Sequence, residues 1–192
     1  MTIKDKITPE LKNRFLQEIL KTIENGKERG FFICKDEKDR LSATKSCEGK
    51  ECGIDLSILE SQCHFKIQGE FHTHPHASKK YFEEQLGRKV SLEDTKRILK
   101  DVAKDKKVSL TEPSYGDVLG TIISRYTGNT SGTTCIGTDI EPDKVECWTT
   151  KNEITEENFF TAAGDLFGDK DVEISPLKWT RNLFNKEIID LK

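Results

Sequence analysis

Residues 65–75 read FKIQGEFHTHP and place two histidines near the end of a predicted β-strand. Successive side chains on a strand point to opposite faces, so His72 and His74 share one face and can reach one cation, with an Asp from elsewhere as third ligand. Four protein ligands usually make a structural zinc site, whereas three ligands plus solvent are typical of sites that activate water. The spacing therefore predicts a metal-dependent hydrolase.

The predicted third ligand lies in a Pro-Ser-x-x-Asp sequence that contains Ser114 and Asp117. Serine followed three residues later by an acid is also an ordinary helix start, and such a cap would hold Asp117 at a fixed place. A second Ser-x-x-Asp, at Ser91 and Asp94, lies closer to the histidines in the chain, so Asp94 remains an alternative ligand. We favour Asp117 because a proline precedes its serine and because residues 118–126 form an apolar helix candidate.

These motifs resemble those of the JAMM metalloproteases, also called the MPN-plus family, which include deubiquitinating isopeptidases. The family pattern is an upstream Glu, then His-x-His-Pro, then Ser-x-x-Asp, which corresponds here to Glu28, His72, His74, Ser114 and Asp117. The resemblance covers roughly the first three quarters of the chain. It implies an α/β fold of the MPN type, in which a mixed β-sheet is flanked by helices in a layering similar to that of cytidine deaminases.

The resemblance also implies a role for each residue. His72, His74 and Asp117 would bind one catalytic zinc ion, which lowers the pKa of its water from about 16 to about 7. Glu28 would move the proton of that water to the leaving amine, and Ser114 would donate a hydrogen bond to the oxyanion. The substrate would be a peptide or isopeptide bond of a ubiquitin-like modifier or its conjugates. A non-catalytic MPN-like scaffold and a metal-dependent hydrolase of a non-protein substrate are the alternatives.

The predicted elements form one domain. A helix is expected between Thr8 and Asn25, followed by strands at 31–35, 41–46, 65–72, 133–137 and 145–149. We expect the metalloprotease-like domain to span residues 1–150, with a helical insertion at about 76–112 because the family usually has a short connection there. This basic insertion either contacts the substrate or is simply solvated. Residues 151–192 are expected to add helices that pack on the same domain.

Composition indicates a water-soluble globular protein. The chain has 192 residues, 34% charged and 34% hydrophobic, with a net charge of -3, and no nucleic-acid partner is implied. No run of about 20 apolar residues is present and the first residues lack an apolar signal core, so we expect a cytoplasmic protein without a membrane partner. The sequence carries no prediction of the oligomeric state.

The six cysteines allow three interpretations. In a reducing cytosol they would be thiols, with Cys34 and Cys135 as small core residues. A second, structural metal could bind Cys47, Cys52 and Cys63, with His64 as a fourth ligand. Disulfides are the third interpretation, with the candidate pairs Cys47–Cys52 and Cys135–Cys147.

Overall fold

The computed structural model describes residues 2–49, 57–75, 112–151, 153–167 and 178–192, together with isolated positions between 87 and 104. Its elements in chain order are η1 (Lys4–Lys6), α1 (Pro9–Asn25), β1 (Arg29–Lys35), β2 (Leu41–Ala43), β3 (Cys47–Glu48), η2 (Ser57–Gln62), β4 (Lys66–His74), α4 (Tyr115–Tyr126), β5 (Thr133–Thr138), β6 (Lys144–Thr150), α5 (Glu156–Phe167), α6 (Lys178–Arg181) and β7 (Phe184–Asp190).

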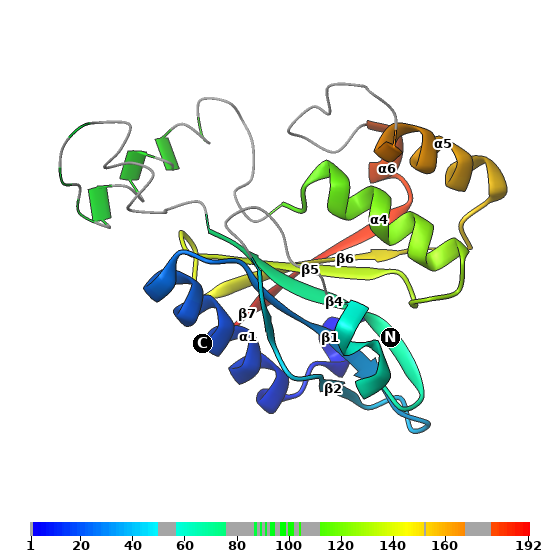
Figure 1. The fold of residues 1–192 in the computed structure, drawn as a ribbon, viewed down its shortest axis with the longest axis horizontal. Helices are drawn as coiled ribbons and strands as arrows, with labels where there is room; N and C mark the ends of the chain where they lie inside the picture. The colour runs from blue at the N-terminus through cyan, green and yellow to red at the C-terminus, as the bar shows by residue number, and fades with distance from the viewer. Residues whose placement is uncertain are drawn as a thin grey trace.

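The strands form one sheet in the order β2-β1-β4-β5-β6-β7, and β3 pairs with the other end of β1 (Figure 1). β4 and β5 run parallel, whereas the other pairs are antiparallel. The prediction of a mixed sheet flanked by helices is confirmed. β4, which carries the histidine pair, lies in the interior of the sheet between β1 and β5, so hydrogen bonds on both edges fix its position.

Helix α1 covers one face of the sheet (Figure 1). Thr8 caps it by accepting a hydrogen bond from the amide of Leu11 at 3.2 Å, and Gly26 ends it in the left-handed conformation at φ 69°. Its apolar stripe is buried against the sheet, where the ring of Phe15 lies 4.7 Å from that of Phe71. This aromatic contact lies directly behind the strand that carries the histidines.

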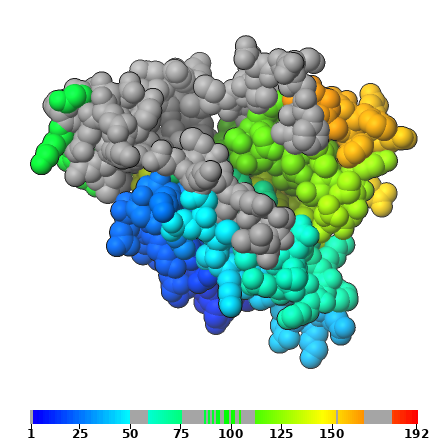
Figure 2. Space-filling view, viewed as in Figure 1, coloured from blue at the N-terminus to red at the C-terminus, as the bar shows by residue number. Residues whose placement is uncertain are grey.

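Helices α4 and α5 cover the opposite face (Figure 1). Val118, Leu119 and Ile122 of α4 are buried in a cluster with Trp148 of β6. α5 packs on α4, where the rings of Tyr126 and Phe159 stack at 4.5 Å. Figure 2 shows the atoms of α4 (green) and α5 (orange) side by side at the surface. These contacts hold α4 on the sheet, and its first turn lies beside the end of β4, where Asp117 contacts His72.

The helices expected within residues 151–192 are present in part. The first, expected after Thr155, corresponds to α5, and the second, expected from Ser175 to Ile188, is confirmed only as the short α6 and is wrong from Phe184 onward. Residues 184–190 instead form β7, which pairs antiparallel with β6 and belongs to the same sheet. The spacing of Phe184 and Ile188 fits a helix, but Ile188 is 48% exposed while Ile189 is fully buried. A strand forms here because, without β7, the outer edge of β6 would have a row of backbone N–H and C=O groups without partners in the sheet.

Two disulfides correct the expectation of thiols. Cys135 and Cys147 lie opposite each other on β5 and β6 and are bonded, as one of the candidate pairs predicted. Cys34 of β1 is bonded to Cys63, a pair that the sequence did not suggest. Cys47 is a free thiol, so the Cys47–Cys52 pair is wrong. Since the sulfur of Cys63 is already bonded, the expected structural metal at Cys47, Cys52 and Cys63 is wrong too.

The predicted insertion at 76–112 lies mostly outside the described residues. Within it, positions 93–94, 97–98, 100–101 and 104 are helical, in the range where a charged helix was expected. Among the described helices, none has both the length and the apolar character needed to span a bilayer.

Candidate metal centre

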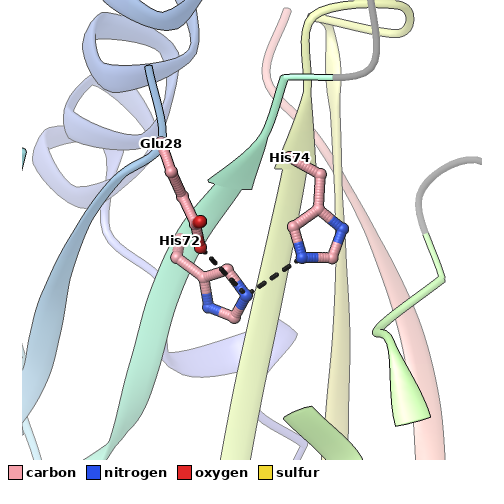
Figure 3. A group of neighbouring side chains, drawn as sticks. All are labelled: Glu28, His72 and His74. Carbon is pink, nitrogen blue, oxygen red and sulfur yellow. Dashed lines mark hydrogen bonds and ion pairs between the residues drawn. The ribbon is translucent and has the colours of Figure 1, made fainter. Parts of the chain in front are cut away.

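The candidate centre is built around the last residues of β4. His72 and His74 project from the same face of this strand, and their Nε2 atoms lie 3.1 Å apart (Figure 3). His72 is almost fully buried at 4% exposure, whereas His74 is partly open. Two ring nitrogens approach this closely only when a proton or a cation lies between them. The strand geometry thus creates half of a cation site.

Helix α4 contributes a carboxylate from its first turn. One oxygen of Asp117 lies 3.2 Å from Nε2 of His72, and the other lies 3.3 Å from Nε2 of His74. A capping box holds this carboxylate: the Ser114 amide donates to it at 2.7 Å, and the Ser114 hydroxyl accepts from the Asp117 amide at 3.2 Å. The acidic residue of the capping box is therefore also the proposed ligand.

Glu28 approaches from the other side, immediately before β1. Its carboxylate lies 3.9 Å from Nε2 of His72 (Figure 3). Gly30 pairs with His72 in the sheet, and a Cβ at Gly30 would lie 2.6 Å from the Phe71 carbonyl oxygen and 3.0 Å from the His72 Cβ. Only glycine lets β1 and β4 approach this closely. The amide of Gly49 donates to the Glu28 carbonyl at 2.9 Å and fixes its backbone.

Thr73, between the two histidines, faces the opposite side of the sheet and anchors the strand. It is fully buried, and its hydroxyl accepts the amide of Arg29 at 2.9 Å and contacts the hydroxyl of Thr22 on α1 at 2.6 Å. One residue thus connects β4, α1 and the beginning of β1. Because Arg29 follows Glu28, this contact sets the position of the carboxylate relative to both histidines.

A buried charge network supports the same segment. Glu18 of α1 has no exposed surface; it accepts from Nε of Arg29 at 2.6 Å and pairs with Lys21 at 3.1 Å. Burial alone would raise the pKa of Glu18, but the hydrogen bonds from Arg29, Ser46 and Lys21 outweigh it and lower the pKa below its usual value. The network fixes the side chain of Arg29 behind the centre.

This network predicts a pH-dependent stability. Because the pKa of Glu18 is lowered in the folded protein, its contribution is present above the unfolded value of about 4.5 and is lost as pH falls through the folded pKa. We expect Glu18→Gln to lower the unfolding free energy at pH 7 by about 1.5–3 kcal/mol, and the gap from wild type to narrow below pH 4.5. Urea titrations at pH 7 and at a pH below 4.5 measure the difference in unfolding free energy between the variant and wild type. The exposed Glu24→Gln on the same helix is the control, and equal behaviour of the two variants contradicts the prediction.

Glu70 is a further carboxylate that the sequence reasoning missed. It lies two residues before His72 on the same face of β4, with Oε1 3.8 Å from Nδ1 of His72 and 3.4 Å from the donating hydroxyl of Thr134. Burial raises the pKa of Glu70, and the nearby charge of His72 offsets part of that rise. Strand alternation could have revealed it, since every second residue from 70 to 74 faces the centre. It lies where an outer carboxylate orients a metal-binding imidazole.

The charges around the histidines favour a cation. Burial alone would lower the pKa of His72, but Asp117, Glu70 and Glu28 outweigh it and raise the pKa to about 9. Burial would likewise raise the pKa of Asp117, yet His72 and His74 hold it well below its usual value. Three carboxylates thus surround two imidazoles, an excess of negative charge.

The donor atoms also fit a single metal ion. One ligand atom each from Glu28, His72 and His74 lie within 4.8 Å of one another, so this buried group could hold a metal ion. For a tetrahedral ion bound at about 2.05 Å, neighbouring ligand atoms are about 3.3 Å apart. The contacts among His72, His74 and Asp117 measure 3.1–3.3 Å. Each pairwise contact thus matches the spacing of neighbouring ligands around a small divalent cation, with one Asp117 oxygen facing each histidine.

The alternative ligand Asp94 has partners of its own. Its carboxylate accepts from the Ser91 hydroxyl at 2.8 Å and pairs with Arg97 at 2.7 Å, in the arrangement of an ordinary helix start. Asp117, by contrast, contacts both histidines. The described geometry therefore favours Asp117 as the third ligand.

No family model, no curated protein and no solved structure matches this chain.

Proposed function

We propose that this protein is a zinc-dependent hydrolase of amide bonds, with His72, His74 and Asp117 as ligands. The observation that carries the proposal is the convergence of these three residues from β4 and α4: the two Nε2 atoms lie 3.1 Å apart, and each lies 3.2–3.3 Å from one oxygen of the Asp117 carboxylate. Two imidazoles and one carboxylate suit zinc, and three protein ligands leave a position for solvent. When bound, zinc supplies an activated water and polarises the substrate carbonyl.

The distance of each carboxylate from His72 distinguishes the proposed ligand, Asp117, from the proposed proton carrier, Glu28. The carboxylate of Glu28 lies 3.9 Å from Nε2 of His72, farther than that of Asp117, and is almost fully buried. A carboxylate just outside the ligand set can accept the proton of the attacking water and then donate it to the leaving amine. Glu28 takes this role. The hydrogen bond from the Gly49 amide to the Glu28 carbonyl fixes the backbone that carries this carboxylate.

Ser114 is placed to assist the developing oxyanion. Its side chain lies at the exposed beginning of α4, and its hydroxyl oxygen accepts the amide of Asp117. An accepting hydroxyl can still donate its own hydrogen. A donor beside the ligands lowers the energy of an anionic intermediate, and removal of one such donor typically reduces kcat by about 10²–10³-fold. The capping serine therefore combines a structural and a chemical role.

The resemblance of the Glu, His-x-His-Pro and Ser-x-x-Asp motifs to the JAMM pattern supports a protein substrate. On that basis the bond to be cut is a peptide or isopeptide bond at the tail of a ubiquitin-like modifier or its conjugates. A non-catalytic scaffold needs no such set of ligands, so the grouping of two imidazoles and a carboxylate, with Asp117 within 3.3 Å of both histidines, supports the enzyme.

The test combines metal content with cleavage. Purified protein should bind one zinc per chain and cut a ubiquitin-like modifier fused through its tail to a fluorescent reporter, with a chelator abolishing cleavage and added zinc restoring it. An isopeptide-linked pair of modifiers and a small acyl anilide, run in parallel, define the substrate class. Stoichiometric zinc without cleavage of any of the three amides contradicts the hydrolase and leaves a metal-binding scaffold.

A further inference from the structure

A small cavity lies beside the metal centre, between α4 and the strands β4 and β5. Its volume is about 170 Å³, and Asp117 belongs both to its lining and to the centre. Pockets that enclose a whole drug-sized ligand measure about 300–1,000 Å³. This cavity therefore has room for a single side chain. Its position next to the proposed ligand places such a side chain close to the bond that would be cut.

The lining of the cavity is rich in hydrogen-bond acceptors. Two carboxylates, Glu70 and Asp117, border it together with the hydroxyls of Ser124 and Thr130, and none of the described lining residues is basic. Carboxylate and hydroxyl oxygens bind a group that carries several N–H donors and a positive charge. Some of these oxygens already accept a hydrogen bond, as Glu70 does from Thr134, but each carboxylate or hydroxyl oxygen can accept a second one, and two carboxylates repel an anionic group.

Two glycines of α4 keep the space open. Gly116 and Gly120 are four residues apart, so they lie on the same side of the helix, and both line the cavity. A Cβ added at Gly120 would meet no atom within 4 Å, and one at Gly116 would meet only the Ser114 hydroxyl at 3.7 Å. Glycine inside a helix is less favourable than alanine, so their presence is not explained by helix stability.

We propose that this cavity binds a lysine-like side chain of the substrate next to the scissile amide. The ammonium group contacts Glu70 and the hydroxyls, and the aliphatic stem crosses the open surface at Gly116 and Gly120. The role of the cavity as a substrate subsite rests on the hydrolase proposed above. The affinity of the cavity for an alkyl ammonium ion does not rest on that proposal, because it depends only on the lining of the cavity.

The first experiment measures binding without turnover. Zinc-free protein is titrated with n-butylammonium and with the neutral n-butanol, and the backbone amide resonances of Gly116, Gly120 and Ser124 are followed by NMR. We expect a saturable shift with n-butylammonium and at least about tenfold weaker binding of n-butanol. Equal affinity for the two probes overturns the proposal, since it indicates a cavity without preference for charge.

Variants at glycine locate the binding. Gly120→Leu should fill the cavity and weaken n-butylammonium binding at least about tenfold, while zinc binding is retained. Gly164→Leu on α5 is the matched control, because Gly164 is also helical with no atom within 4 Å of an added Cβ. If Gly120→Leu does not fold, Gly120→Ala serves: it should raise the melting temperature yet weaken binding. Unchanged binding in a folded Gly120 variant overturns the proposal.

A cleavage assay distinguishes the subsite proposal from the hydrolase proposal. Wild type should cleave a reporter peptide with lysine beside the scissile amide faster than one with the neutral, similarly shaped norleucine, and Gly120→Leu should lose this preference. If no amide is cut, the hydrolase fails while the ammonium titration still decides the cavity. If amides are cut with no preference for lysine, the subsite proposal fails and the hydrolase stands.

Discussion

In the Glu28→Gln variant we expect kcat to fall by about 10²–10⁴-fold while one zinc per chain remains bound, because the amide keeps the shape of the carboxylate but cannot accept a proton. The residue is nearly buried and lies 3.9 Å from His72, so the substitution changes charge without opening space. The measurement is kcat on the modifier–reporter fusion together with elemental analysis of the same sample.

A matched substitution controls for the loss of negative charge. Glu24→Gln removes a carboxylate from the exposed end of α1 and should leave kcat unchanged. Retention of full activity by Glu28→Gln would show that the proton follows another route. Loss of zinc from Glu28→Gln would instead make Glu28 a ligand, which the grouping of Glu28, His72 and His74 within 4.8 Å also allows.

The His74→Ala variant should lose both zinc and activity. Even substitutions of residues that only support a ligand typically weaken metal binding by about 10–100-fold, so we expect removal of a ligand to weaken it by more than about 100-fold. Competition with a chromogenic chelator measures this affinity. His74 is partly open and packs less tightly than His72, so the fold should survive, and circular dichroism verifies it.

His64→Ala is the control for His74→Ala. His64 is exposed and lies just before β4, whereas the histidine pair lies at the other end of this nine-residue strand. This variant should bind zinc and turn over like wild type. If His74→Ala kept stoichiometric zinc and normal cleavage, the ion would have to bind elsewhere, and the assignment of all three ligands would be wrong.

Local patterns in the sequence predicted the parts of the centre that depend on local geometry. Alternation along β4 places His72 and His74 on one face, and the cap at Ser114 fixes Asp117 in the first turn of α4. The role of Glu28, however, was inferred from a resemblance. Its distance from His72 follows from the β1–β4 register, in which Gly30 pairs with His72, and such pairing is not encoded in any short stretch.

Other features could not be predicted because they depend on contacts between distant segments. The bond between Cys34 and Cys63 requires η2 to fold back over β1, and cysteine spacing alone does not define pairings. β7 forms because β6 offers an edge, although the spacing of Phe184 and Ile188 fits a helix. The anchoring of Thr73 by Thr22 likewise appears only when α1 packs on the sheet.

The anchor at Thr73 bears on how the candidate site would take up an ion. Because the residue between the two histidines is tied to α1 and to the backbone of Arg29, the strand is held in place from behind, independently of anything bound in front. The imidazoles are therefore assembled during folding, and little conformational entropy remains to be lost when a cation arrives. Loading and unloading can then proceed reversibly on an intact scaffold, so that one sample can be stripped and reconstituted repeatedly without being unfolded.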